Sequence, residues 1–249
     1  MCGRFTLKIS SRVLDKQFLL EEPTSEMADR FNIAPSQQVL GIQNDEESNK
    51  HTAFHARWGL IPFWAKDEKI GYKMINARSE TAATKPAFRA AVKQRRCILP
   101  ASGFYEWKRD EKQKQPYYIY PKKGNAQYLA MAGLWETWRS PSGEVLTSAT
   151  VLTTSANAFM AEIHDRMPVF LSPETYSTWL DTSKPLDEET YQALVKPAPD
   201  DWLACHPVST RVNSPRNEDA TLIAIEERPP PFSPKTDGEK TTPTQQDLF

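Results

Sequence analysis

The fold is decided by residues 97–107, which read Cys97-Ile98-Leu99-Pro100-Ala101-Ser102-Gly103-Phe104-Tyr105-Glu106-Trp107. Three further apolar or aromatic runs follow at 117–120, 128–135 and 147–153, and segments rich in charge, glycine or proline separate them. Short runs bounded by turn-forming residues are typical of strands, and neighbouring strands joined by short turns pair antiparallel. The pattern therefore predicts an antiparallel sheet or barrel.

The segments around this core predict further short strands and short helices. Strands are expected at 39–42, 53–58 and 206–209, whereas 58–64 contains too much glycine and proline for a helix. Neither a repeat nor an alternation of βαβ units is present, which argues against a Rossmann fold. The expected class is α+β, with one domain at 1–228. Apolar spacing and capping residues predict helices at 10–18, 86–95, 156–163, 173–180 and 188–195.

Length and composition are those of a globular protein. The chain has 249 residues, 39% of them hydrophobic, with seven Trp and eleven Phe, which is enough for a substantial core. Its net charge is −1, so binding to nucleic acid must come from a local patch and not from the overall field. Three cysteines form no CxxC pair, and neither a membrane-length apolar run nor an apolar leader is present. We therefore expect a protein of the reducing cytoplasm.

The chain changes character after Arg228. Residues 229–249 contain five prolines and, among large apolar side chains, only Phe232, Leu248 and Phe249. Such a segment cannot bury enough apolar surface to offset the entropy lost when it is ordered. We expect a disordered tail there.

Chemistry is expected first at the N-terminus, Met1-Cys2-Gly3-Arg4-Phe5. Removal of Met1 would leave Cys2 with an α-amine and a thiol on adjacent carbons, which condense with an aldehyde as an imine and then as a thiazolidine. Reference pKa values of about 7.7–8.0 for the amine and about 8.5 for the thiol leave both nucleophiles partly available near neutral pH. Gly3 permits close approach of the backbone, and Arg4 suits phosphate. A small second residue without a catalytic role is the alternative on these five residues alone.

Three other places in the chain hold polar residues that suit catalysis. Asn76 and Arg78 are two residues apart and would face the same side of a strand. An ordinary polar edge strand is the alternative explanation for this pair. Glu106 lies among aromatic residues, where it is either paired or desolvated, and desolvation would raise its pKa into the range useful for acid–base work. His164 has a carboxylate and a guanidinium as neighbours that could set its charge, although a structural histidine would look the same.

A basic stretch runs from residue 85 to residue 96. It contains five basic residues and no acidic one. A face for nucleic acid and a solvated helix surface would both have this composition. The five residues are Lys85, Arg89, Lys93, Arg95 and Arg96.

A histidine pair, His51 and His55, has the i,i+4 spacing of a helical zinc site. The pair lies in an expected strand, and neither a glutamate nor a third ligand stands nearby. We therefore expect no metal and no cofactor.

Six segments of the chain follow one another in an order that is known from one protein family. They are Met1-Cys2-Gly3-Arg4-Phe5, Asn32-Ile33-Ala34-Pro35, Trp58-Gly59-Leu60-Ile61-Pro62, Asn76-Ala77-Arg78-Ser79-Glu80-Thr81, Gly103-Phe104-Tyr105-Glu106-Trp107 and Ile163-His164-Asp165-Arg166-Met167-Pro168. Together they resemble the SRAP family (SOS-response-associated peptidase), the abasic-site-processing proteins, and a bacterial member in particular. The resemblance covers about residues 2–228 and leaves only the tail outside.

The resemblance implies a single α+β domain on an open, barrel-like, mainly antiparallel sheet with short helices around it. It also implies covalent capture of abasic sites in single-stranded DNA through a thiazolidine, which shields the lesion during replication or the SOS response. Cys2, freed by removal of Met1, would be the nucleophile and Glu106 the acid–base residue, while Asn76 and His164 would align the sugar. The implied enzyme removes its own Met1, as a peptidase-like hydrolase, with lyase activity as a further option.

The resemblance also implies a surface for single-stranded DNA. Arg4 and Arg78 would hold phosphates, and Trp64 with its aromatic neighbours would stack on bases. Relatives place an arginine after the Ala-Ala-Thr triplet, where this chain has lysine and proline, so that contact would move to Lys85 or Arg89. The expected DNA-binding residues are Arg4, Asn32, Pro35, Trp64, Arg78, Lys85 and Arg89.

The last five residues, Gln245-Gln246-Asp247-Leu248-Phe249, resemble the peptide by which bacterial proteins dock on the replication sliding clamp. In such peptides a glutamine, here Gln245, fills a small pocket, and a Leu-Phe pair, here Leu248 and Phe249, fills an apolar one. A flexible, proline-rich tether would raise the effective concentration of the docked domain near single strands. An ordinary chain end is the alternative. We expect the protein in the cytoplasm, and at the nucleoid when it is bound to DNA.

Two other functions stay open on the sequence. An N-terminal-nucleophile amidohydrolase or peptidase, such as a glutaminase domain, also begins with Met-Cys-Gly. The nine glycines of this chain and the Arg4-Phe5 continuation fit it poorly. The other function is noncovalent binding of single strands, in which Cys2 takes no part. Crosslinking to an abasic site separates both from covalent capture.

Overall fold

The computed structural model describes residues 2–8, 10–22, 24, 27–45, 50–109, 114–122 and 127–226 of the 249-residue chain. The expected tail at 229–249, with Gln245, Leu248 and Phe249 of the clamp-binding motif, lies outside the described residues. Within the described part, no helix is long and apolar enough to cross a membrane.

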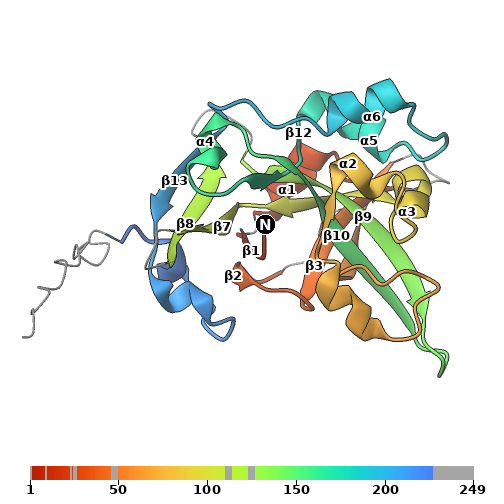
Figure 1. Ribbon diagram of the computed structural model, residues 1–249, viewed down its shortest axis with the longest axis horizontal. Helices are drawn as coiled ribbons and strands as arrows, with labels where there is room; N and C mark the ends of the chain where they lie inside the picture. The colour runs from red at the N-terminus through yellow and green to blue at the C-terminus, as the bar shows by residue number, and fades with distance from the viewer. Residues whose placement is uncertain are drawn as a thin grey trace, which may run out of the picture.

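Five strands form a closed ring, which is the barrel of the fold (Figure 1). They are β3 (Gln38–Asn44), β4 (His51–Trp58), β6 (Arg96–Ala101), β9 (Leu129–Arg139) and β10 (Val145–Ser155). Their order is β10-β4-β3-β6-β9, and the pairing of β9 with β10 closes the ring. Neighbouring strands are antiparallel except β4 and β10, which run parallel.

Three short strands extend the barrel. β5 (Asn76–Arg78) runs parallel to β10, β11 (Arg166–Pro168) runs antiparallel to β10, and β12 (Phe170–Leu171) runs antiparallel to β9. Because β5 and β11 both pair with β10, one strand holds the segment of Asn76 and the segment that leads from His164 into β11.

A second, antiparallel sheet lies beside the barrel (Figure 1). Its order is β13 (Leu203–Pro207), β8 (Lys114–Pro121), β7 (Gly103–Arg109), β1 (Arg4–Leu7) and β2 (Arg30–Ile33). The N-terminal strand β1 is therefore not an edge strand, because β7 pairs with it on one side and β2 on the other.

The run 97–107 serves both sheets. It supplies most of β6 in the barrel and the first part of β7 in the second sheet, with Ser102 between them. The main-chain N–H of Ser102 donates to the carbonyl oxygen of Thr6 (2.8 Å), which holds the junction against β1. At Gly103 a Cβ atom would lie 2.5 Å from the ring of Tyr118, so no side chain fits. The one strand that the sequence predicted is thus two strands that join the sheets.

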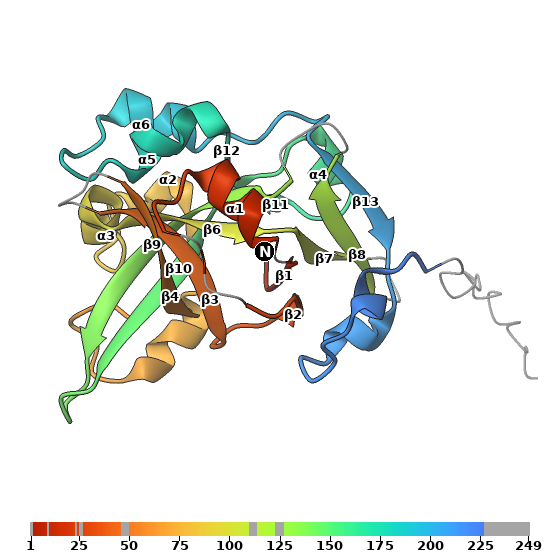
Figure 2. The same cartoon turned by 180° about the vertical axis from the view of Figure 1, so that it is seen from behind.

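Short helices cover the sheets, and α1 lies on the face turned toward the viewer in Figure 2. Its apolar side chains Leu14 and Phe18 are buried, as their spacing predicted. α3 begins at Arg89, later than the expected start at Pro86, because residues 83–88 form turns. The barrel-like, mainly antiparallel core with short helices is confirmed. The α-helices are α1 (Ser11–Phe18), α2 (Ser79–Ala82), α3 (Arg89–Gln94), α4 (Ala158–Ala161), α5 (Tyr176–Leu180) and α6 (Glu188–Leu194), and the 3₁₀ helices are η1 (Glu68–Lys73), η2 (Pro173–Thr175), η3 (Thr210–Asn213) and η4 (Ala220–Ile223).

Candidate active site

Cys2 lies immediately before β1 and is completely buried. Its thiol donates to the carbonyl oxygen of Arg4 (3.7 Å), and its own carbonyl accepts a 2.8 Å hydrogen bond from Asn76 Nδ2. Burial, together with the negative charge of Glu106, raises the pKa of the Cys2 thiol well above its ordinary value. The structure therefore brings Cys2, Asn76 and Glu106 together and keeps the thiol protonated.

Glu106 enters the site from β7, the strand next to β1. Arg4 pairs with Tyr105 across these two antiparallel strands, so Glu106 lies one residue nearer to the N-terminal end of β1. Glu106 is only 3% exposed, so its carboxyl group lies in a water-poor environment. Charges act strongly on one another in such a water-poor environment, which explains the effect of this carboxylate on the thiol of Cys2.

Asn76 reaches Cys2 from the first position of β5. The amide donates through Nδ2, while its Oδ1 is buried and has no hydrogen-bond partner among the described residues. The side chain is thus anchored to the main chain of Cys2 and presents an acceptor on its other side. The role of Asn76 toward the sugar stays a prediction, and its contact in the structure is with the main-chain carbonyl of Cys2.

His164 follows α4, and its main-chain N–H donates to the carbonyl oxygen of Met160 (2.8 Å). The ring nitrogen Nδ1 lies 3.0 Å from the main-chain nitrogen of Arg166 and 2.8 Å from Asp165 Oδ1. The side chain is 20% exposed. The Nδ1 edge of the ring is therefore engaged by the loop that carries it.

Arg4 and Asn32 tie the N-terminal strands to the C-terminal segment. Arg4 Nη1 donates to Asn32 Oδ1 (2.9 Å) and to the carbonyl oxygen of Val212 (2.8 Å). Asn32 is completely buried, and its Nδ2 donates to the carbonyl oxygen of Asn217 (2.9 Å). Protein groups thus engage both side chains, and a direct contact of either with DNA stays a prediction. Pro35, just after β2, is partly exposed.

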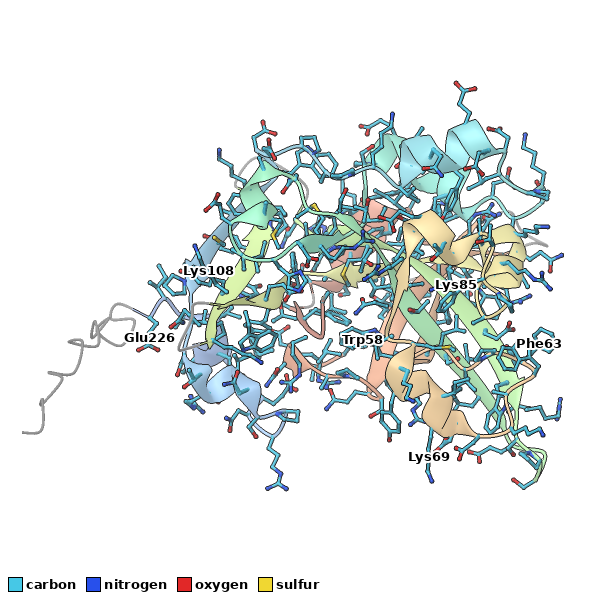
Figure 3. The ribbon with its side chains drawn as sticks, viewed as in Figure 1. Trp58, Phe63, Lys69, Lys85, Lys108 and Glu226 are labelled. Carbon is cyan, nitrogen blue, oxygen red and sulfur yellow. The ribbon has the colours of Figure 1, made fainter. Side chains whose placement is uncertain are left out.

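The basic stretch provides three exposed side chains on and before α3. Lys85, Arg89 and Lys93 are exposed, and so is Arg78 at the end of β5 (Figure 3 marks Lys85). Arg78 ends the strand that Asn76 begins, and the other three lie on segments that follow this strand in the chain. These four exposed cations could bind phosphates, and their contact with DNA stays a prediction.

Arg95 and Arg96 do not belong to that surface. Arg95 forms a 2.8 Å ion pair with Glu136, which is buried. Arg96 is itself buried, and burial lowers its pKa to about 10. The basic face expected from the sequence is therefore smaller by two residues, because these guanidinium groups hold elements together. The guanidinium of Arg96 donates to the carbonyl oxygens of Val92, Lys93, Trp179 and Asp181.

The aromatic run 58–64 divides into a buried anchor and an exposed tip. Trp58 is buried, and its Nε1 donates to the carbonyl oxygen of Ile75 (2.9 Å). Phe63 and Trp64 are 62% and 50% exposed. Figure 3 shows Phe63 at the periphery of the molecule and Trp58 nearer its centre. Phe63 and Trp64 are thus exposed to solvent at the end of a run whose first residue, Trp58, is anchored in the core.

A pocket of about 430 Å³ is lined by none of the residues of the candidate active site. Tyr128, Phe170 and Trp202 contribute to its walls, and no predicted site residue lines it.

His51 Nδ1 lies 2.7 Å from the carbonyl oxygen of Phe18. Within the described ranges, no group of three or more His, Cys, Asp or Glu side chains is placed to hold a metal ion.

A sequence model of the family described as SOS response associated peptidase (SRAP) matches residues 1–215. The chain belongs to the SRAP family. Abasic site processing protein YoqW of Bacillus subtilis is 47% identical over 226 residues, which are 90% of this chain and 99% of the relative. Abasic site processing protein HMCES of Xenopus tropicalis is 38% identical, over 77% of this chain and 64% of the relative. The resemblance seen in the sequence is confirmed.

Solved structures share the architecture of this SRAP chain. An X-ray structure of a protein from Bacteroides thetaiotaomicron matches it with a TM-score of 0.78 at 25% identity, covering 90% of this chain and 100% of that one. An X-ray structure of a protein from Bordetella bronchiseptica matches with a TM-score of 0.70 at 27% identity, covering 84% and 100%. The barrel with its second sheet is thus found in experimental structures too.

The SRAP chain also contains contacts that the sequence did not indicate. Arg166 forms a double hydrogen-bonded ion pair with Glu80, 86 residues earlier. Both lie in quoted motifs, but only the pairing of β5 and β11 with β10 brings them together. Glu218, beyond the range matched by the family, accepts hydrogen bonds from the main-chain N–H groups of Phe31 and Asn32. Neither pair has a signal in local sequence.

Proposed function

We propose that this SRAP protein captures abasic sites in single-stranded DNA covalently, with Cys2 as the nucleophile. The observation that carries the proposal is the grouping of Cys2 with Asn76, which holds its carbonyl at 2.8 Å, and with Glu106, whose charge acts on its thiol. The names of relatives 45–47% identical to this chain, all abasic site processing proteins, support the same substrate.

The reaction needs no oxidant or reductant. After Met1 is removed, the α-amine of Cys2 adds to the aldehyde of the open sugar, and loss of water gives an imine. The thiol then adds across the C=N bond: sulfur bonds to the former carbonyl carbon, and the thiol proton goes to nitrogen. Because burial and Glu106 keep the thiol protonated, we expect the amine to attack first.

Glu106 and His164 are proposed to open the closed form of the sugar. An abasic deoxyribose is mostly a hemiacetal, and opening moves a proton from its hydroxyl to the ring oxygen. Groups placed for such transfers contribute roughly 10²–10⁴ in rate. Glu106 would also assist hydrolysis of the Met1–Cys2 bond, so the site would release its own nucleophile as a peptidase-like hydrolase. The open imine would permit β-elimination and cleavage of the DNA strand, which is the lyase path. Because closure of the thiazolidine removes the imine, this cleavage would be only a side reaction.

The DNA strand is proposed to follow the exposed cations and the aromatic tip. Arg78, Lys85 and Arg89 offer charge to phosphates, and Trp64 offers a stacking face. Stacking contributes about 1–3 kcal/mol per base without preference for sequence. Affinity should therefore fall with salt and depend little on sequence. Arg4, Asn32 and Pro35 are proposed to contact the DNA strand close to Cys2.

The bacterial replication sliding clamp is proposed as a second partner, on the sequence of residues 245–249. The domain at 1–228 would supply the chemistry, and the tail would bring it to the nucleoid. Deletion of the last five residues should abolish capture of the protein by immobilised clamp and leave crosslinking in solution intact. Retained capture would eliminate this partner.

Incubation of the purified full chain with uracil-excised single-stranded DNA, followed by denaturing electrophoresis, tests the proposed function. We expect a shifted band with the native chain and none with Cys2→Ala or with an undamaged strand. The intact mass of the adduct should equal that of the protein without Met1 plus the DNA minus one water. A shifted band with Cys2→Ala, or an adduct that retains Met1, would refute the mechanism.

A further inference from the structure

Arg166 and Glu80 form a two-pronged ion pair beside the loop of His164. Arg166 Nη1 lies 2.5 Å from Glu80 Oε1, and Nη2 lies 2.9 Å from Oε2. Nη2 also donates to the carbonyl oxygen of Thr153 at 2.7 Å. The pair thus joins three elements, β11, α2 and β10. The planar fork of arginine allows this geometry, and a lysine cannot reproduce it.

The main chain of Arg166 acts on His164. Its N–H donates to His164 Nδ1 at 3.0 Å, so this ring nitrogen must offer a lone pair. Asp165 Oδ1 lies 2.8 Å from the same nitrogen and would instead favour a proton there. The Asp165 side chain is 86% exposed and can turn into solvent, whereas the Arg166 N–H is fixed by β11. The main-chain donor therefore decides, and the neutral ring carries its proton on Nε2.

We propose that the Glu80–Arg166 ion pair is a positioning device that fixes the ring of His164 as a hydrogen-bond donor through Nε2. The inference rests on the proposed function and assigns a direction to its acid–base pair. His164 then donates to an oxygen of the sugar, and Glu106 is the group that accepts the proton. Glu80 and Arg166 touch no reacting atom in this scheme and act only through His164.

The negative charge of Glu80 also affects DNA binding, and this effect opposes its benefit to the covalent step. Its carboxylate is close enough to Arg166 and Arg78 for both guanidinium groups to hold its pKa below the ordinary value, the hydrogen-bonded Arg166 having the larger effect. The carboxylate therefore offsets positive charge on the surface proposed for DNA. Removal of Glu80 should tighten noncovalent binding while it slows the covalent step. A purely structural role would weaken both.

Single-turnover crosslinking of the full chain, measured against DNA concentration, tests the proposal with Glu80→Ala. The rate at saturating DNA should fall about tenfold or more, since small displacements of catalytic groups carry such costs. The half-saturating DNA concentration should stay equal or decrease. Arg166→Lys keeps the charge and loses the fork, so its saturating rate should fall as well. A native saturating rate for Glu80→Ala would overturn the inference.

Glu68→Ala is the matched control, because Glu68 forms a similar pair with Arg57. That pair spans 2.6 Å with exposures of 49% and 15%, against 2.5 Å with 50% and 12% for Glu80 and Arg166. The control variant loses an equal charge on η1, away from the His164 loop, and its saturating rate should stay native. A rate loss as large in the control would show a general effect of charge or stability and would overturn the positioning role.

Nitrogen chemical shifts of the histidine rings test the same inference without DNA. At pH 8 the ring of His164, identified by its loss in His164→Gln, should show a proton on Nε2 in the native chain. In Glu80→Ala the two tautomers should mix. A proton on Nδ1 in the native chain would overturn the inference. If the native chain formed no crosslink at all, the proposed function would be refuted. The tautomer of the His164 ring could still be measured in that case, because this experiment uses no DNA.

Discussion

Asn76 Nδ2 donates a 2.8 Å hydrogen bond to the carbonyl oxygen of Cys2. Asn76 begins β5, which is attached to the barrel, whereas Cys2 precedes β1 of the second sheet. The bond sets the direction of the main chain at Cys2, the proposed nucleophile, and with it the directions of its amine and its thiol. The barrel therefore positions a group that the other sheet carries.

Asn76→Asp should slow crosslinking at saturating DNA by about 100-fold, since it keeps the shape of the side chain and removes the donor. It also adds a negative charge beside Glu106. Single-turnover kinetics measure the rate, and a filter-binding assay on undamaged DNA should show nearly native affinity. Asn217→Asp removes a comparable 2.7 Å bond to the carbonyl of Arg211 and should leave the rate unchanged. Native kinetics in Asn76→Asp would contradict the role of the bond.

The three cysteines should differ in their reaction with iodoacetamide. Cys2 and Cys97 are buried, whereas Cys205 is partly exposed. Burial raises the pKa of both buried thiols, so little thiolate forms in them. In the folded chain at pH 8, Cys205 should be alkylated faster than the other two by a factor on the order of ten or more. Peptide mass spectrometry after a short pulse measures this, and early labelling of Cys2 would contradict its burial.

Stability should decrease between pH 8 and pH 9.5. A thiol whose pKa is raised by folding stabilises the fold fully below the unfolded pKa, about 8.5, and this contribution is lost as the pH rises above it. Cys2 and Cys97 both shift in this direction because of burial. The urea midpoint should therefore be lower at pH 9.5, and Cys97→Ala should reduce the difference between the two pH values. An equal midpoint at both pH values would speak against the raised pKa of these thiols.

Arg96→Lys should lower the free energy of unfolding by about 3 kcal/mol, because a lysine cannot reach all the buried carbonyls that the guanidinium bonds. Urea denaturation measures the loss. Arg89→Lys, at an exposed position of the neighbouring helix α3, should change it by less than about 0.5 kcal/mol. For binding to single-stranded DNA, we expect the change at Arg89 to have the larger effect. Arg89→Ala should reduce the salt dependence of binding by about one phosphate contact. A native urea midpoint for Arg96→Lys would refute its structural role.

Glu218→Ala should lower the free energy of unfolding by about 1–2 kcal/mol, because two main-chain N–H groups of β2 lose their acceptor. In a domain of this size the melting temperature should fall by about 2–8 °C. Calorimetry measures the change, and Glu144→Ala on the exposed turn between β9 and β10 serves as the control. An unchanged melting temperature for Glu218→Ala would show that these two hydrogen bonds add no stability.

The sequence predicted the strands well where apolar runs end at turn-forming residues. The run 97–107 was identified as strand, but its division at Ser102 depends on a bond to Thr6, far away in the chain. The parallel pairing of β4 with β10 likewise has no local signal, because it depends on how the ring closes. Local pattern thus predicts the elements, and tertiary contacts decide which strands become neighbours.

The candidate site was predicted in part. Motif resemblance pointed to Cys2, Asn76 and Glu106, which the structure places together. Arg96 was misjudged because a basic residue at the end of a helix usually faces water, and its carbonyl partners come from two different helices. The partner of Arg166 could not be predicted either, since Glu80 belongs to another motif and long-range pairing leaves no trace in composition.

The ties from Arg4 and Asn32 to residues 212–217 have a consequence for protein synthesis. Cys2, the proposed nucleophile, and its strand β1 are synthesised some 200 residues before the groups that hold this strand. At about 5–20 residues per second, this delay is on the order of ten seconds or more. A nascent chain should therefore be inert toward damaged DNA until translation is nearly finished.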